Sequence, residues 1–302
     1  MATAVVTPGV RRVKPFDPAR AARRALLYAL IAFGALVFSF PFVWMLSTSL
    51  KTSQNVFDFP PSIIPPSFQW INYPHVLQSF PFLQGLTNTM TIVIGVEIGR
   101  LLSVPLAAYA FARFKFPLRG PLFILVLATM MMPGQALLIP QYLIFRNFGW
   151  LDTYLPLTIP SLFAGGSLGA FSVFLLRQFF LSIPREYAEA AELDGCGFLR
   201  TYWHIILPLS KPALAVVAIF TFIQEWNDFF GPLIYLTSSD KFTLAVSFQA
   251  WSQVQAAGPG YTPEPFNNIM AVAALITLVP ILVFFFTQRL FIRGVVMSGM
   301  KG

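Results

Sequence analysis

The sequence predicts an all-α polytopic membrane protein with six transmembrane helices. Hydrophobic residues make up 56% of the 302 residues and charged residues only 11%, whereas a soluble domain carries about 25% charge. The apolar residues gather in six uninterrupted stretches, each long enough to supply the about 20 residues that a helix needs to cross a bilayer. Continuous stretches favour helices over a membrane barrel, because barrel strands alternate apolar and polar residues. An aromatic content of 16% excludes a disordered chain.

The six spans are expected to form one transmembrane domain, at residues 25–302. Their expected positions are Leu26–Leu46, Leu86–Ala112, Pro121–Tyr142, Leu157–Phe180, Leu207–Phe230 and Ile269–Ile292. Residues 1–24 are predicted to be an N-terminal tail, and residues from about 293 to 302 a C-terminal tail. The first stretch is too long for a cleaved signal peptide, and no small-residue cleavage site follows it.

The distribution of basic residues predicts that both termini are cytoplasmic. Of the 20 lysines and arginines, 16 fall in the tails and loops on the side of the termini. Three fall in the opposite loops and one inside the second span, namely Lys51, Arg146, Lys241 and Arg100. Cytoplasmic loops of membrane proteins carry such an excess. We therefore attribute the net charge of +8 to loops that face anionic lipid, and expect no nucleic-acid partner.

Motifs for catalysis and metal binding are absent or out of context. No Gly-Lys dipeptide occurs, so the chain has no phosphate-binding loop of its own. Gly165–Gly169 matches the nucleophile-elbow pattern of hydrolases, but that elbow needs a strand-to-helix turn, whereas this segment lies in an apolar span. The only histidines, His75 and His204, lie in loops, and Cys196 is the single cysteine. We expect no catalytic residue, no metal site and no internal disulfide.

One pair of charged residues lies inside the second span. Glu97 and Arg100 are three residues apart, so they share a helix face and are expected to pair. Charges inside a membrane are costly and are often functional. The pair is therefore either mutually neutralised or part of a translocation path, and the sequence leaves both readings open.

A second polar cluster, Glu225-Trp226-Asn227-Asp228, lies near the outer end of the fifth span. Its acceptors beside an aromatic face are the combination that binds sugar hydroxyls, which makes the cluster a candidate for a substrate path or gate. The alternative is a solvated helix end.

The loop between the fourth and fifth spans, at about residues 182–208, is amphipathic and dense in charge. Pro184 suits a first helical turn, good helix formers follow to Leu193, and Gly195 and Gly197 are expected to stop the helix by a left-handed cap. Tyr187, Ala190, Ala191 and Asp194 would then share one face, which the two alanines make thin. We interpret the segment as a small helical knob that enters a cleft on a partner. The alternative, a helix lying on the membrane surface, normally has a larger and basic face.

The same loop resembles the EAA motif of the membrane subunits of ABC importers. Glu189-Ala190-Ala191 is followed after three residues by Gly195, and after nine more by Ile205-Ile206-Leu207-Pro208. Other stretches are similar to the carbohydrate-uptake branch, in particular the second membrane subunit of maltose-type transporters. These are Asn88-Thr89, Ala108-Tyr109-Ala110 with Arg113, Pro133-Gly134-Gln135 with Pro140, and Trp226–Phe229 with Pro232-Leu233.

The resemblance implies a permease subunit for sugars, oligosaccharides or related polyols in a prokaryotic inner membrane, which works by alternating access. It implies a second permease subunit as a heterodimer partner, two ATPase subunits that hold ATP and Mg, and an extracytoplasmic substrate-binding protein. This chain would bind no cofactor of its own. The residues expected to couple to the ATPase are Glu189, Ala190, Ala191, Asp194, Gly195, Ile205, Leu207 and Pro208.

Two other functions remain as alternatives. A secondary transporter driven by an ion gradient would need a carboxylate relay inside the membrane, for which Glu97 is the good candidate. Inverted repeats and helices broken at the membrane midplane, which mark many such transporters, are not evident in the sequence. A membrane-bound hydrolase would rest on Gly165–Gly169 alone.

Overall fold

The computed structural model describes residues 18–254 and 265–299, and every regular element in these two ranges is a helix. The long helices are α1 (Pro18–Ser49), α3 (Phe82–Arg113), α7 (Gly166–Ser182), α11 (Lys211–Trp226) and α14 (Phe266–Gly299). The shorter ones in the first half are η1 (Asn55–Phe57), α2 (Asn72–Ser79), α4 (Arg119–Met131), α5 (Gly134–Asn147), α6 (Leu155–Thr158) and η2 (Ile159–Phe163). Those in the second half are α8 (Glu186–Leu193), α9 (Phe198–Thr201), η3 (Tyr202–Ile206), α10 (Leu207–Leu209), α12 (Phe230–Tyr235), η4 (Ser239–Lys241) and α13 (Leu244–Val254).

The number of membrane spans agrees with the sequence prediction, but their continuity does not. Four segments of the described chain are long and apolar enough to cross a membrane, namely Pro18–Ser49, Phe82–Arg113, Leu155–Ser182 and Phe266–Gln288. Two bent helix pairs bring the total to six if each pair is counted as one span. One pair is bent by 103° between α4 and α5, and the other by 76° between residues 198–209 and α11. The third predicted span therefore bends in its middle, and the fifth bends near its start, between Leu209 and Lys211.

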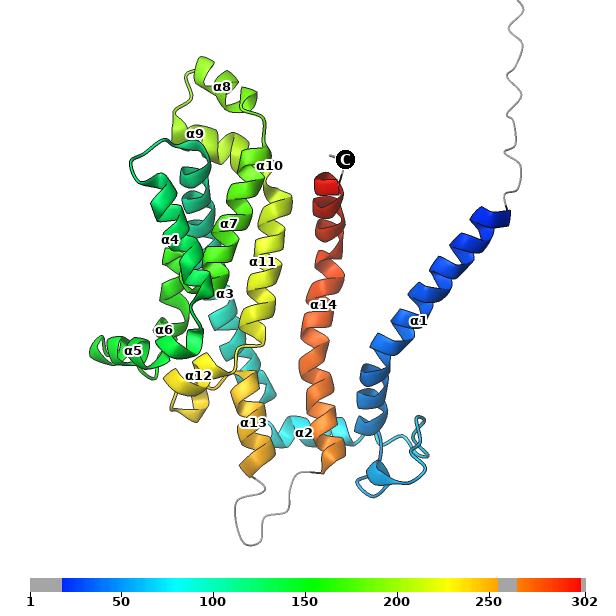
Figure 1. Ribbon diagram of the computed structural model, residues 1–302. Helices are drawn as coiled ribbons and strands as arrows, with labels where there is room; N and C mark the ends of the chain where they lie inside the picture. The colour runs from blue at the N-terminus through cyan, green and yellow to red at the C-terminus, as the bar shows by residue number, and fades with distance from the viewer. Residues whose placement is uncertain (1–17, 255–264, 300–302) are drawn as a thin grey trace, which may run out of the picture.

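The third span breaks at a proline that the sequence displays. Met132 is extended, with φ −76° and ψ 122°, because the residue before a proline is disfavoured in the helical region and Pro133 follows. The 13 residues of α4 rise about 20 Å, less than the roughly 30 Å of the hydrocarbon core. α5 then runs across the direction of the other helices, as Figure 1 shows.

The fourth span is also irregular, because η2 and α7 meet at Ala164, which is left-handed with φ 52°. η2 packs closely on α3, and Gly99 makes this approach possible. A Cβ at Gly99 would collide with the Ser161 side chain and lie 3.0 Å from the backbone nitrogen of Leu162. Ser103 on α3 completes the contact, since its Oγ donates to the carbonyl of Ser161 at 2.8 Å.

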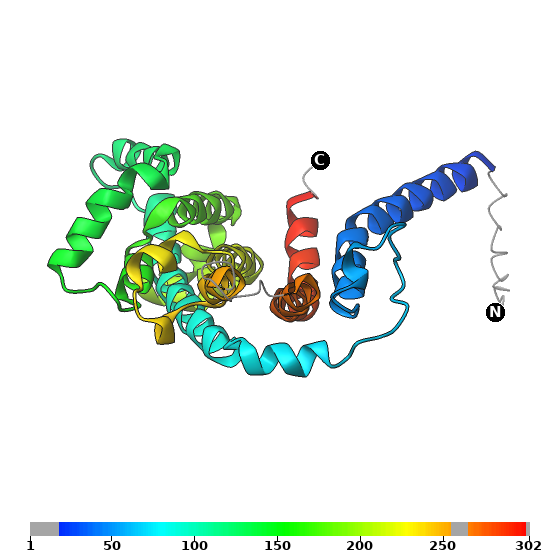
Figure 2. The same ribbon diagram turned by 90° about the horizontal axis from the view of Figure 1, so that it is seen from below.

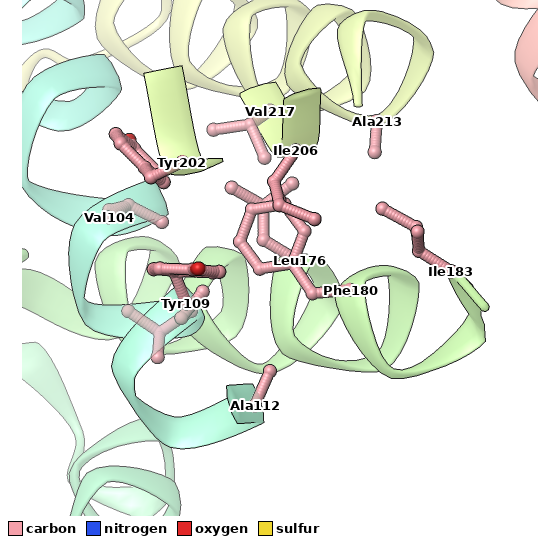
Figure 3. Packing of buried hydrophobic residues seen from close by; sticks show 12 residues of the cluster. Val104, Tyr109, Ala112, Leu176, Phe180, Ile183, Tyr202, Ile206, Ala213 and Val217 are labelled. Carbon is pink, nitrogen blue, oxygen red and sulfur yellow. The ribbon is translucent and has the colours of Figure 1, made fainter. Parts of the chain in front are cut away.

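A core of buried side chains joins α3, α7, η3 and α11 in the half of the molecule nearest α8. Figure 3 shows Tyr109, Phe180, Tyr202 and Ile206 turned toward one another at its centre. The Tyr109 ring lies 6.2 Å from Phe180 and 5.2 Å from Tyr202, centroid to centroid. Aromatic pairs at these distances add to the stabilisation from buried apolar area. The core therefore fixes the base of the 182–208 loop to two transmembrane helices.

A second core lies at the opposite end, where α2, α11, α13 and α14 meet around Val76, Phe80, Trp226 and Leu244. α1 stands apart from both cores and packs on α14, which Figures 1 and 2 show as separate from the bundle formed by α3, α4, α7 and α11. The apolar side chains of α1 are exposed along most of its length. Such a helix needs an apolar environment, as a membrane or a partner subunit provides.

The two ends of the molecule carry different elements. The start of α1, the end of α14 and α8 lie at one end, and α2, α12 and α13 lie at the other (Figure 1). The start of α1, the end of α14 and the loop thus share a side, as the sequence predicts. α1 begins at Pro18, within the predicted N-terminal tail, and α14 continues to Gly299, within the predicted C-terminal tail.

Candidate functional site

The 182–208 loop contains the predicted helix, and the helix ends as expected. α8 runs from Glu186 to Leu193, and Gly195 is left-handed with φ 77°. The N–H of Gly195 donates to the Glu192 carbonyl at 3.0 Å, and the N–H of Cys196 donates to the Ala191 carbonyl at 2.8 Å. These bonds satisfy carbonyls that a helix end otherwise leaves free. Gly197, which was also expected to be left-handed, is extended with φ −74° and directly precedes α9 as its N-cap residue.

The exposed face of α8 differs in one residue from the predicted one. Glu189, Ala190 and Asp194 are exposed, together with Gly195. Ala191 is only 3% exposed, so it packs inside the chain and does not lie on the exposed face. The remaining candidate residues lie in the second half of the loop, where Ile205 and Leu207 are half-buried and Pro208 is exposed.

The loop stands on a rigid base. Tyr202 and Ile206 in η3 are 1% and 0% exposed and belong to the first core. Arg113, the last residue of α3, donates from Nη2 to the carbonyls of Phe180 and Ile183, at 2.9 and 2.7 Å. The ends of α3 and α7 are therefore tied together beneath the loop. A displacement of α8 would be transmitted to these helices through its base, because packed interiors resist compression.

The charged pair inside the membrane is formed across two helices and not within one. Arg100 on α3 places Nη1 3.6 Å from Oε1 of Glu225 on α11, with the two side chains 4% and 10% exposed. The same Nη1 donates to the hydroxyl of Thr221 at 3.3 Å. The expected pairing of Arg100 with Glu97 is thus superseded by a cross-helix pair. Within the described part of the chain, Oε2 of Glu97 is buried and has no hydrogen-bond partner.

The residues of the cluster Glu225–Asp228 have different environments and do not form one sugar-binding face. Glu225 pairs with Arg100, and Oδ1 of Asp228 accepts from the N–H of Gly231 at 3.2 Å, at the start of α12. Trp226 is 7% exposed and stacks on Phe222 at 5.7 Å, because it belongs to the second core. Asn227 is exposed.

Trp226 and Asn227 nevertheless border a cavity. Its volume is about 250 Å³, and α11, α13 and α14 line it. Leu244, Phe248 and Ile276 make most of its wall apolar, and Thr277 adds a hydroxyl. Of the predicted polar cluster, only Trp226 and Asn227 therefore face a space that a ligand could enter.

Sequence reasoning missed a polar clamp at the end opposite α8. Asp152, in the turn before α6, accepts from the N–H groups of Thr237 and Ser238, the hydroxyl of Ser238 and Nζ of Lys241, at 3.0, 2.9, 2.6 and 2.8 Å. The hydrogen bonds from Lys241 and Ser238 hold the pKa of Asp152 well below its ordinary value, and Asp152 in turn raises the pKa of Lys241. Partners some 85 residues apart leave no pattern in a sequence. The left-handed backbone of Asp152, φ 57°, is equally invisible there.

The Gly165–Gly169 segment does not lie in the strand-to-helix turn that the hydrolase pattern requires. The helix that starts at Gly166 follows the 3₁₀ helix η2, and not a strand. His75 lies in α2, at the other end of the molecule from His204, whose Nδ1 contacts the carbonyl of Arg200 at 3.0 Å. These positions do not bring a histidine to the glycine-rich segment.

Comparisons with known proteins agree with this arrangement. The family model for the inner membrane component of binding-protein-dependent transport systems matches residues 103–297, more than half of the chain. The sn-glycerol-3-phosphate transport system permease protein UgpE of Yersinia enterocolitica is 33% identical over 278 residues, which cover 90% of this chain and 95% of that protein. The UgpE protein of Escherichia coli O1:K1 is 30% identical over 277 residues, with the same coverage.

A solved structure has the same fold. It is the crystal structure of a bacterial ABC transporter involved in the import of the acidic polysaccharide alginate, and it matches with a TM-score of 0.73 over 96% of this chain and 100% of that one, at 22% identity. Together with the family match, this confirms the resemblance to permease subunits of ABC importers and the all-helical permease fold. The chain is a transport subunit and not an enzyme, and it belongs to the family of inner membrane components of binding-protein-dependent, ATP-driven importers.

Proposed function

We propose that this permease carries sugars, oligosaccharides or related polyols, and that α8 couples it to ATPase subunits. The relatives named for sn-glycerol-3-phosphate support this substrate class, because glycerol phosphate is a phosphorylated polyol. The cavity beside Trp226 supports it as well, since the exposed Asn227 at its border offers an amide to a polyhydroxylated solute. The family gives no support to transport driven by an ion gradient.

The single observation that carries the coupling proposal is the exposed helix on a buried base. Glu189, Ala190 and Asp194 are exposed on α8, and η3 below them is locked into the core of α3 and α7. In this proposal an ATPase cleft receives α8, and closure of the ATPase dimer pushes the base and rocks the spans. ATP needs only to favour the closed arrangement over the open one for the population to shift.

The complete importer, in this proposal, contains a second permease subunit, two ATPase subunits and an extracytoplasmic binding protein. ATP and Mg stay in the ATPase subunits. The end of the molecule that holds α8, the start of α1 and the end of α14 faces the cytoplasm, in keeping with the 16 basic residues predicted for that side.

Reconstitution tests the substrate class. The chain would be purified with the products of its neighbouring genes and placed in liposomes with the cognate binding protein. We expect ATP-dependent uptake of a sugar, a polyol or glycerol-3-phosphate, and a rise in the thermal stability of the binding protein with the same compound. Uptake of amino acids or metal ions in place of these compounds would contradict the proposal.

A further inference from the structure

A cavity lies behind α8, between the loop and the ends of α3 and α4. Its volume is about 350 Å³, near the lower end of ligand pockets, which span roughly 300–1,000 Å³. Arg113, Lys115 and Arg119 line it from the α3–α4 turn, and Arg185 and Glu189 from the side of α8. Of the α8 residues that the coupling proposal uses, Glu189 also lines this cavity, whereas Ala190 and Asp194 do not.

The charge of the lining favours an anion. Four cationic side chains face two carboxylates, Glu189 and Glu192, which leaves an excess of two positive charges. Arg119 is engaged, since it donates to the carbonyls of Phe114 and Ala112 at 3.1 and 3.4 Å. Within the described residues, Lys115 and Arg185 form no salt bridge, and Nε of Arg113 is buried without a hydrogen-bond partner. The N–H donors of Lys115 and Arg185 and the Nε–H of Arg113 are therefore available to a ligand in a partly enclosed space.

The position of the cavity favours a ligand that is also apolar. Arg113 ends α3 and Arg119 begins α4, so the cationic groups lie where two spans leave the membrane. Large apolar side chains stand exposed beside them, with Leu118 at 69%, Phe198 at 70% and Leu181 at 43% exposed. A cationic pocket with an apolar rim at the cytoplasmic membrane surface matches the headgroup and upper chains of an anionic lipid.

We propose that this cavity binds the phosphate headgroup of an anionic phospholipid of the inner leaflet. Lys115 and Arg185 would hold the phosphate, Arg113 would add its free N–H, and the exposed apolar rim would contact the acyl chains. The lipid would bridge the α3–α4 turn and the base of α8, and so stiffen the support of the coupling helix. The two carboxylates in the cavity would limit the affinity, because they repel phosphate. This proposal rests on the orientation given with the proposed function, in which α8 faces the cytoplasm. It does not depend on the class of solute that is transported.

Native mass spectrometry of the purified importer in detergent tests the proposal. The assembled complex would be titrated with phosphatidylglycerol and, separately, with phosphatidylcholine of equal chain length. We expect phosphatidylglycerol to bind preferentially, and the double variant Lys115→Gln/Arg185→Gln to weaken it by about fivefold for each cation removed. The matched control is Arg24→Gln/Lys211→Gln, which removes the same charge from exposed positions outside the cavity. It should bind the lipid as the wild type does.

Cys196 supplies a second measurement that needs no variant. It is the single cysteine of the chain and lines the cavity, so bound phosphatidylglycerol should slow its reaction with a thiol reagent, and phosphatidylcholine should not. Three outcomes would overturn the proposal. The double variant could bind phosphatidylglycerol as the control does, or inorganic phosphate could protect Cys196 as well as the lipid. Finally, the double variant could lose its ATPase subunit while keeping the lipid, which would make the cavity a protein contact. None of these results depends on which solute is transported.

Discussion

Replacing Gly195 with valine tests whether coupling requires the left-handed backbone at the end of α8. Gly195 has φ 77°, and a Cβ built there meets nothing within 4 Å. The cost of valine is therefore backbone strain without collision, about 1–2 kcal/mol for an L-residue in the left-handed region. Such a strain shifts a local equilibrium by roughly 5–30-fold.

The helix end has a direct way to relieve this strain, since it can unwind. That would break the bonds that Gly195 and Cys196 donate to the last turn of α8 and would move Asp194 from its place on the exposed face. We expect substrate-stimulated ATP hydrolysis and solute uptake in proteoliposomes to fall by roughly 5–30-fold. Insertion into the membrane should be unchanged, because the loop lies outside the spans.

Gly197→Val is the matched control. Gly197 is extended, with φ −74° and ψ 169°, and a Cβ there also meets nothing within 4 Å, so valine adds volume without strain. Gly195→Asn should be intermediate, because asparagine tolerates the left-handed region better than valine does. If Gly195→Val and Gly197→Val transported equally well, the geometry of the helix end would be irrelevant and the reasoning refuted.

Three further predictions test other parts of the structure. Glu225→Gln should lower the free energy of unfolding by about 3–5 kcal/mol, because it leaves Arg100 buried without its partner. The double variant Arg100→Gln/Glu225→Gln should recover most of that loss in a thermal unfolding measurement. A double variant as unstable as Glu225→Gln would contradict this. Asp152→Asn should make residues 237–241 more sensitive to protease. Because the pKa of Asp152 is lowered in the folded state, its stabilisation is present above the ordinary carboxyl pKa and is lost only as the pH falls through the lowered value. The difference in melting temperature from wild type should therefore stay constant between about pH 5 and 8. Single cysteines in a cysteine-free background should react with an impermeant reagent from outside at Phe59, which is 96% exposed, and not at Lys115; the reverse pattern would invert the topology.

The sequence predicts those features that depend on neighbours along the chain. The span count follows from apolar length, and the left-handed Gly195 follows from a helix that must end before a second one starts. The bend after Met132 could also have been predicted, because Pro133 and Gly134 stand in the middle of the third apolar stretch. The length of the apolar stretch does not reveal this bend, because α4 and α5 are both apolar.

Features that depend on contacts between distant segments could not be predicted. Glu97 and Arg100 share a face by their spacing, but α11 brings Glu225 to Arg100 from 125 positions away, and the pair forms there. The aromatic face of Trp226 looked available for a sugar, yet the packing of α11 against α13 and α14 buries it. Ala191 was placed on the outer face by helical periodicity, which gives the angle between residues but not the side on which α9 packs.

A site-specific photo-crosslink tests the central claim, that α8 docks into an ATPase subunit, most directly. Benzoylphenylalanine at Ala190, which is exposed on α8, would be compared with the same residue at Phe59, exposed at the opposite end. Irradiation of the intact importer in membranes should join the ATPase subunit to the chain from Ala190 and not from Phe59. Capture from both positions, or from neither while the ATPase subunit still co-purifies, would contradict the account.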